Sequence, residues 1–274
     1  MLGIGVSLRY PRGGAAPAPA PDPIALLFAH GEAGDEWLFE RDFCYTLSGG
    51  GVYERVTTTG DQIARVTGRH NGINADQINV PSRPIYNEGG GLSWGFFEID
   101  DFLVTPTITP GTDKAQICAG VRKLSDAALG VIAGLTASVS TTGALTLDSR
   151  RYAAGDYAMT IRNASANSVQ NFVNYPAPIT SVLSALYDQA GANIDEELSL
   201  RANGALSAKG GTGLYNAGST DFASSNFYIG SQGGASAFLN ANIYSLTARF
   251  GPRPDLSTIQ DVESYYASKT GVTL

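Results

Sequence analysis

Three carboxylates stand close together in the segment Leu92–Pro106, which is the densest apolar and aromatic block of the chain. If this segment is extended, alternate side chains share a face, so Glu98 and Asp100 point the same way. Two carboxylates about 5–5.5 Å apart can hydrolyse a glycoside with retention of configuration. The neighbouring pair Asp100 and Asp101 could instead supply oxygen ligands to Ca²⁺, which takes six to eight. Two carboxylates are too few for a complete site, so the competing interpretation is a strand corner whose aspartates accept backbone N–H bonds.

Other catalytic chemistries find less support in the sequence. A serine or cysteine nucleophile needs a histidine base, and the two histidines, His30 and His70, both lie in glycine-flanked segments typical of solvated turns. No nucleophile elbow, phosphate-binding loop, dinucleotide fingerprint or metalloprotease motif is present. Cys44 and Cys118 have no zinc-site spacing, and we expect two small buried hydrophobic residues, with a disulfide between them as the alternative. The sequence therefore favours a protein that is not an enzyme and has no cofactor, with Ca²⁺ as the one cation to consider.

Charge and composition restrict the partners. The formal net charge is −7, and no cluster of Lys and Arg is available to displace counterions from a nucleic acid or to bind an anionic membrane. No run of about 18 apolar residues occurs, and the first ten residues lack the apolar core of a secretory signal. We therefore expect no nucleic-acid partner and no membrane partner. A chain of 274 residues can form one large β-sandwich.

The positioning elements show strand spacing. Phe97 and Ile99 would share one face of the first strand in Leu92–Pro106, and a second strand would begin near Phe102 and close at Pro106. Four further segments alternate between apolar and polar residues: Gln116–Arg122, Tyr157–Arg162, Glu197–Ala202 and Ile243–Phe250, the last with Tyr244 on the face of Leu246 and Phe250. Such strands, dry on one face and wet on the other, predict antiparallel sheets stacked about 10 Å apart.

Short motifs set the ends of two elements. Asn203-Gly204 predicts a hairpin turn after the third of these strands. After the last strand, Asp255 or Ser257 could cap a helix, with Ser257 and Gln260 spaced as a capping box. Gly271 would end this helix, which we expect to pack across the end of the sandwich. The predicted fold is all-β: an antiparallel two-sheet jelly-roll sandwich with a short C-terminal helix.

The N-terminal region predicts an attachment segment. Leu2, Ile4, Val6 and Leu8 alternate with small or polar residues and form a candidate docking strand over residues 1–10. Residues 11–23 are rich in Pro, Ala and Gly, which favours a semi-rigid linker. The alternative is a strand that folds back on its own domain. Residues 24–274 would form the sandwich, with the loop-rich stretch Ile24–Gly90 wrapped around it.

With these strands placed, the chain resembles the concanavalin A-like lectin/glucanase jelly roll, in the laminin-G-like version of tailed-phage, prophage and gene-transfer-agent-like structural proteins. The similar pieces, in chain order, are Arg83-Pro84, Phe97–Leu103, Leu198–Gly204, Phe227–Gly230, Leu239–Leu246 and Ile259–Leu274. The resemblance includes glucanases, whose pattern places a third acidic residue two positions after Asp100, and Phe102 stands there. The resemblance therefore weakens the hydrolase interpretation.

The resemblance implies a virion structural protein: a head or tail fibre, spike or decoration subunit, assembled in the host cytoplasm and anchored to a capsid or tail partner by its N-terminus. Sugar sites on such folds use loop aromatics and amides, and the candidates in the Gly/Ser-rich segment Lys209–Asn226 are Tyr215, Asn216, Asp221 and Phe222. We expect a host cell-surface polysaccharide as ligand, and a homo-oligomer, with a trimer as one option. The alternatives are a purely structural decoration and a glycan depolymerase.

Overall fold

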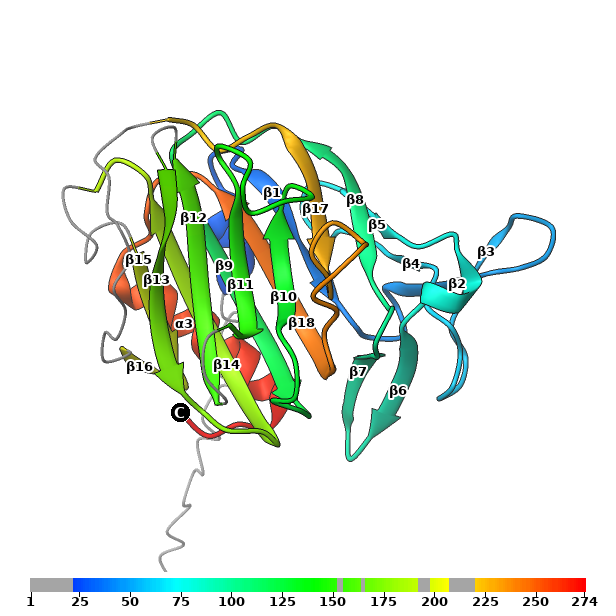
Figure 1. Ribbon diagram of the computed structural model, residues 1–274. Coiled ribbons are helices and arrows are strands. Elements are labelled where there is room, and N and C mark those ends of the chain that lie inside the picture. The colour runs from blue at the N-terminus through cyan, green and yellow to red at the C-terminus, as the bar shows by residue number, and fades with distance from the viewer. Residues whose placement is uncertain (1–21, 152–154, 164–165, 192–197, 207–219) are drawn as a thin grey trace, which may run out of the picture.

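The computed structural model describes residues 22–151, 155–163, 166–191, 198–206 and 220–274, and it shows two antiparallel sheets stacked face to face (Figure 1). This arrangement confirms the predicted all-β jelly-roll sandwich with a C-terminal helix. No helix in the described part of the chain combines the length and the apolar character needed to cross a bilayer.

Sheet A has eight strands in the order β16-β15-β14-β9-β18-β7-β6, and β1 also pairs with β18. Its central strand β18 pairs with β9 along one side and with β7 and then β1 along the other. The strands are β1 (Ala33–Leu38), β6 (Ile85–Gly89), β7 (Leu92–Phe97), β9 (Lys114–Lys123), β14 (Ile179–Asp188), β15 (Leu198–Ala202), β16 (Ala205–Leu206) and β18 (Ala241–Phe250).

Sheet B has ten strands in the order β13-β12-β11-β10-β17-β8-β5-β4-β2-β3. They are β2 (Cys44–Leu47), β3 (Tyr53–Arg55), β4 (Arg65–Val66), β5 (Ala75–Asp76), β8 (Leu103–Ile108), β10 (Gly130–Leu135), β11 (Leu145–Arg150), β12 (Asp156–Asn163), β13 (Ala166–Asn174) and β17 (Ser225–Ile229). The expectation that Ile24–Gly90 only wraps the sandwich is wrong, because β1 and β6 belong to sheet A and β2–β5 to sheet B. Several of these strands have two or three residues, too few for an alternation pattern to show.

Within the described residues, three helical elements accompany the sheets. Helix α1 (Pro23–Leu27) begins at Pro23, which the sequence assigned to the linker, and Asp22 caps it by accepting the N–H of Ile24 at 3.0 Å. A 3₁₀ turn, η1, covers Val80–Ser82. Helix α3 (Leu256–Thr270) is capped by Asp255, which accepts the N–H of Thr258, and ends at Gly271 in the left-handed conformation, as predicted.

The core lies between the sheets and is rich in aromatic residues. The Trp37 ring from sheet A stacks on Phe227 from sheet B with centroids 5.6 Å apart. Phe39 and Phe97 pack edge to face at 5.7 Å in the same core. Strands β12 and β18 lie where Tyr157–Arg162 and Ile243–Phe250 predict them, so the alternation in these two segments locates strands correctly.

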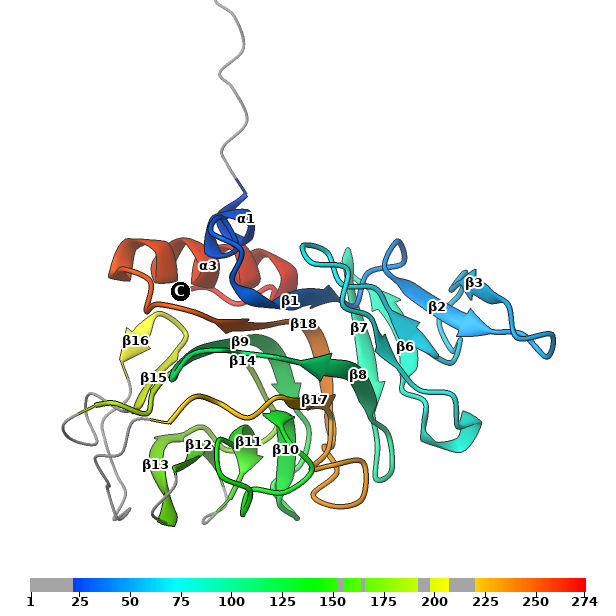
Figure 2. The same ribbon diagram turned by 90° about the horizontal axis from the view of Figure 1, so that it is seen from above.

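The outer face of sheet A is dry where it was predicted wet. Figure 2 shows α1 and α3 on the side of sheet A opposite to sheet B, so α3 covers a face of the sandwich rather than its end. Polar side chains of the sheet are buried under this helix and form hydrogen bonds with it. Arg201 of β15 makes a bidentate pair with Glu263 of α3 at 2.7 and 3.1 Å. The alternation pattern shows two faces, but it does not show that a helix covers the polar one.

Three local predictions, two about side-chain direction and one about a strand end, are wrong. Strand β7 ends at Phe97, so Ile99 lies in a turn with 80% of its surface exposed. Pro106 lies inside β8 rather than closing it, at a bulge where the register with β17 shifts, and a bulge tolerates the missing N–H. In β18 a bulge between Ile243 and Ser245 places Ile243 in the core, so Tyr244 does not share the inward face of Leu246.

Candidate functional site

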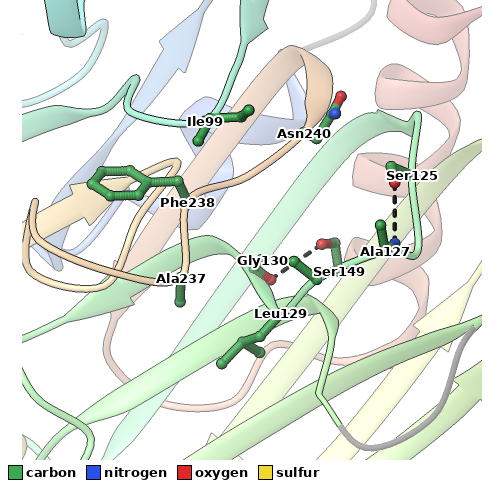
Figure 3. Close-up of a pocket in the computed structure, with 10 residues that line it drawn as sticks. Ile99, Ser125, Ala127, Leu129, Gly130, Ser149, Ala237, Phe238 and Asn240 are labelled. Carbon is green, nitrogen blue, oxygen red and sulfur yellow. Dashed lines mark hydrogen bonds between the residues drawn. The ribbon is translucent and has the colours of Figure 1, made fainter.

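A cleft of about 380 Å³ opens at one end of the sandwich (Figure 3). The register aligns the end of β7, the end of β9 and the start of β18, because Ala241 pairs with both Phe97 and Lys123. The connections that follow or precede these three strands therefore meet around one opening. The residues that line it are Ile99, Ser125, Ala127, Ala128, Leu129, Gly130, Ser149, Ala237, Phe238 and Asn240.

One wall of the cleft is apolar. Figure 3 shows Ile99 and Phe238 on the same side of the opening, with Leu129 below them. Phe238 lies in the loop before β18, and its ring packs against the Phe102 ring with centroids 6.5 Å apart. This contact holds Phe238 in place. Gly234 allows this packing, since a Cβ there would lie 2.7 Å from the Phe102 ring. A large apolar side chain as exposed as Ile99 is available for contact with a ligand.

The opposite wall is polar. Ser125 Oγ accepts the N–H of Ala127 at 3.0 Å, and Ser149 Oγ donates to the carbonyl of Gly130 at 3.1 Å. The exposed side chain of Asn240 makes no hydrogen bond with any residue that the structure describes. Its carbonyl oxygen and its amide NH₂ group therefore remain able to accept and donate hydrogen bonds to a ligand. The cleft combines an apolar surface with donors and acceptors, as small-molecule sites usually do.

A buried ion pair supports the polar wall. Lys123, at the end of β9, is fully buried, and its Nζ lies 2.7 Å from Oδ1 of Asp126. The same ammonium donates to the carbonyl oxygens of Ser149 and Asp156 at 3.1 and 3.2 Å. Burial alone would raise the pKa of Asp126, but the N–H of Ala177 and the ammonium of Lys123 outweigh it and lower that pKa. These bonds hold the connection between β9 and β10 at the mouth of the cleft.

The carboxylates of the first strand do not form a catalytic pair. Because β7 ends at Phe97, Glu98 and Asp100 lie exposed in a turn and share no strand face. Asp101 is buried and accepts the N–H of Glu98 at 2.8 Å, which is the corner interpretation of the sequence. Burial chiefly raises the pKa of Asp101 to about 6, opposed by this hydrogen bond. In the described ranges no group of three or more His, Cys, Asp or Glu residues could hold a metal ion.

Of the sugar-binding residues expected from the sequence, Asp221 and Phe222 are described, and neither lines this cleft. Tyr215 and Asn216 lie outside the described residues. Asp221 is exposed, but Phe222 is a core residue, 3% exposed and packed edge to face on Phe250 at 6.0 Å. A ring buried in this way offers no face to a sugar, so the interpretation of Phe222 as a stacking residue is wrong. The docking residues Leu2, Ile4, Val6 and Leu8 also lie outside the described part of the chain.

The surroundings of the two histidines and the two cysteines can be compared with the predictions. His30 is exposed, as expected, whereas His70 is half-buried, stacks on Phe28 at 5.1 Å and points its Nε2 at Glu36, 3.4 Å away. The expectation of a solvated turn is therefore wrong for His70. Both cysteines are buried and unpaired, which confirms the favoured interpretation, and burial raises the pKa of each thiol.

Sequence reasoning missed the cleft because its walls come from four separate stretches. Among the lining residues, only Phe238 has a sequence feature typical of a sugar site, because it is an aromatic residue in a Gly/Ser-rich connection. The longer segment Lys209–Asn226 has the same feature and was therefore preferred. The alignment of Phe97, Lys123 and Ala241 is a property of the sheet register.

No family model matches this chain, and a search of curated proteins returns no match. Among solved structures, the botulinum neurotoxin serotype G binding domain aligns with a TM-score of 0.52 and 12% identity, over 84% of this chain and 51% of that chain. A structure of botulinum neurotoxin type C, whose cell entry depends on interaction with two ganglioside molecules, gives 0.47 and 9% identity over 90% and 53%. The Ruminococcus gnavus IT-sialidase CBM40 bound to α2,3-sialyllactose gives 0.41 and 15% over 54% and 82%.

This chain aligns with about half the length of the two botulinum structures. At 12% identity, the likeness to the serotype G domain is a likeness of fold. The chain is therefore a two-sheet, jelly-roll-like β-sandwich whose fold is shared with a toxin binding domain.

Proposed function

We propose that this protein is a non-catalytic carbohydrate-binding domain and that the cleft at the end of the sandwich is its sugar site. The observation that carries the proposal is the division of the cleft into an apolar wall at Phe238 and Ile99 and a polar wall at Asn240 and Ser125. A pyranose ring has the same division, with C–H groups on one face and hydroxyls around the edge. The cleft volume of about 380 Å³ suits one or two sugar units.

The fold and the missing catalytic pair support the same proposal. The fold is shared with the binding domain of a toxin. Glu98 and Asp100, the carboxylates that could have hydrolysed a glycoside, lie in an exposed turn. A reducing-sugar assay tests this point, and release of sugar that disappears in Glu98→Gln would make the protein a depolymerase instead.

A glycan array followed by titration of the strongest ligand tests the cleft. Phe238→Ala and Asn240→Ala should each weaken binding about five- to tenfold, which corresponds to about 1 kcal/mol. The matched control is Val52→Ala, a change at an exposed apolar residue of the β2–β3 hairpin, and it should leave affinity unchanged. If the array shows no binding, or if both cleft variants bind like the wild type, the cleft is not a sugar site.

We also propose that the domain is displayed on a virion and attached through residues 1–23. The alternating strand of residues 1–10, the Ala/Pro linker and the resemblance to phage structural proteins support this role. Many copies on one particle could raise avidity by about 10²–10⁴, which makes a weak sugar site sufficient for adsorption. Particles assembled with a protein lacking residues 1–21 test the attachment. Undiminished incorporation of the shortened protein would contradict it.

A further inference from the structure

A second surface lies on the outer face of sheet A, beyond the end of α3. The helix covers this face only as far as Gly120 and Leu92: a Cβ on Gly120 would lie 2.6 Å from Thr270, and one on Gly271 would lie 3.5 Å from Leu92. Past this boundary no described helix packs on the sheet. The strands continue, so the side chains there face outward without cover from α3.

The register places five of these side chains in one row. Ile85 pairs with Phe96, Phe96 with Asn242, Asn242 with Arg122, and Arg122 with Thr180, across β6, β7, β18, β9 and β14. Their neighbours along the strands, Phe97, Val121, Ile243 and Ala241, belong to the core between the sheets. Because side chains alternate along a strand, the row faces away from that core.

Aromatic rings form the floor of this surface. Trp94 and Phe96 are two residues apart on β7 and both are half-buried, so each shows part of its ring to solvent. The Trp94 ring packs on Tyr244 with centroids 5.8 Å apart and planes at 52°. The bulge in β18 turns Tyr244 to this side. We name Trp94, Phe96, Arg122, Asn242 and Tyr244 the outer-face platform.

The platform carries a positive charge without a counter-ion. Arg122 is exposed and makes no ion pair within the described ranges, whereas Arg41, Arg65, Arg201 and Arg249 each contact a carboxylate at 2.5–2.7 Å. Arg122 lies in the same row as Asn242, an amide that is 8% exposed, hydrogen-bonds Tyr244 and keeps further donor and acceptor capacity for a hydroxyl.

We propose that the outer-face platform is a second sugar site, separate from the cleft and specific for a carboxylated sugar. The C–H face of the sugar would lie on Trp94 and Phe96, its carboxylate would accept a bidentate pair from Arg122, and Asn242 would bond a hydroxyl. A guanidinium matches the planar, two-oxygen geometry of a carboxylate, which a neutral sugar lacks. The platform therefore discriminates acidic sugars from neutral ones.

Other occupants fit the platform less well. A peptide cannot add to this surface as a strand, because the row crosses five strands whose backbones are already paired. A purely apolar partner, including a second copy of this chain that presents apolar residues, would bury the exposed guanidinium of Arg122 without a partner, which is costly. A carboxylated sugar satisfies the rings, the charge and the amide together.

Tryptophan fluorescence reports on the platform directly. The chain has two tryptophans, and Trp37 is fully buried in the core, so only Trp94 can respond to a ligand at the surface. The probes are sialyllactose and a galacturonic acid trisaccharide, each compared with its carboxyl-reduced form. We expect at least one of the two acidic probes to shift or quench the Trp94 emission at millimolar concentration. The carboxyl-reduced forms should have no effect. Raised salt should weaken the response.

Variants separate the platform from the cleft and from simple charge effects. Arg122→Gln should weaken acidic-sugar binding about five- to tenfold and remove its salt dependence. The control Arg253→Gln, at another exposed arginine, should bind like the wild type. Phe238→Ala should keep the Trp94 response, which distinguishes this proposal from the proposed function of the cleft.

Three results would overturn the proposal. The first is no change in emission with either acidic probe, and the second is an equal response to acidic and reduced sugars. The third is a response that survives Arg122→Gln unchanged. Sedimentation of the unliganded protein completes the test, because self-association lost in Trp94→Ala would assign the platform to a second copy.

Discussion

The sharpest stability prediction concerns the buried ion pair below the cleft. Asp126→Asn removes the carboxylate that lies 2.7 Å from Lys123 Nζ and keeps an oxygen for the N–H of Ala177. The ammonium of Lys123 then remains buried with the carbonyls of Ser149 and Asp156 as its remaining hydrogen-bond acceptors. Removing one partner of a buried pair costs about 3–5 kcal/mol. The Asp126 side chain is 14% exposed, so we expect the lower end, about 3 kcal/mol.

Removing the other partner, Lys123, should cost less. Lys123→Met removes the fully buried charge and leaves Asp126 with an N–H partner and some access to water. After that change, Asp126→Asn should add little, so the two effects should not be additive and the coupling should be about 2 kcal/mol. The exposed pair Arg55–Asp42, with side chains 60% and 74% exposed, is the control, and Asp42→Asn should cost less than about 0.5 kcal/mol.

Urea unfolding of the wild type and the four variants at pH 7, followed by circular dichroism, measures these free energies. Burial already lowers the pKa of Lys123, opposed by Asp126, and in Asp126→Asn this pKa should fall further. The folded state then binds fewer protons than the unfolded state between that pKa and about 10.4, so its stability rises with pH there. The defect of Asp126→Asn should therefore shrink between pH 7 and pH 9.5. Equal costs for Asp126→Asn and Asp42→Asn, or additive effects of the two buried changes, would refute this reasoning.

Three further changes test single positions. The pKa of Asp101 is raised to about 6, so the folded state binds more protons than the unfolded state from about pH 4 to pH 6, and stability should fall as the pH rises through this window. Asp101→Asn should remove that dependence and raise stability at pH 7 by about 1–2 kcal/mol, as measured by urea unfolding at pH 4.5 and 7; an unchanged pH profile would contradict the assignment. Gly230→Ala combines φ of +86° with a Cβ that would lie 2.4 Å from the Phe97 ring, so thermal unfolding should show a loss of about 3 kcal/mol or more. Gly204→Ala has φ of +78° and only ordinary contacts, and its loss should be about 1 kcal/mol; equal losses at the two glycines would count against the clash with Phe97.

Local sequence signals predicted the elements whose causes are local. Asn203-Gly204 forms the predicted turn because both residues take positive φ, at 49° and 78°, which these residue types tolerate. Gly271 ends α3 for the same reason. Strand β12 follows from the alternation of Tyr157, Met159 and Ile161, all of which lie in the core.

Long-range contacts account for most of what the sequence did not show. The polar face of sheet A is dry because α3 and α1 cover it, with pairs such as Arg249–Glu32 that join residues 217 positions apart. A serine or arginine on a strand looks the same in the sequence whether water or a helix lies above it. The alternation of apolar and polar residues in β15 therefore predicted a strand in a sheet, but it did not predict that helices cover the polar face of that sheet.

A single bulge explains why the platform could not be read from the pattern. Strict alternation puts Asn242 and Tyr244 with Leu246 in the core, and it leaves the outer face of β18 with Ile243 and Ser245. The extra residue at the bulge instead brings Tyr244 against Trp94 and next to the row of Asn242 and Arg122. Bulges often redirect a side chain at functional sites. The position where the alternation fails is therefore the one that assembles aromatic, amide and guanidinium groups on the same face.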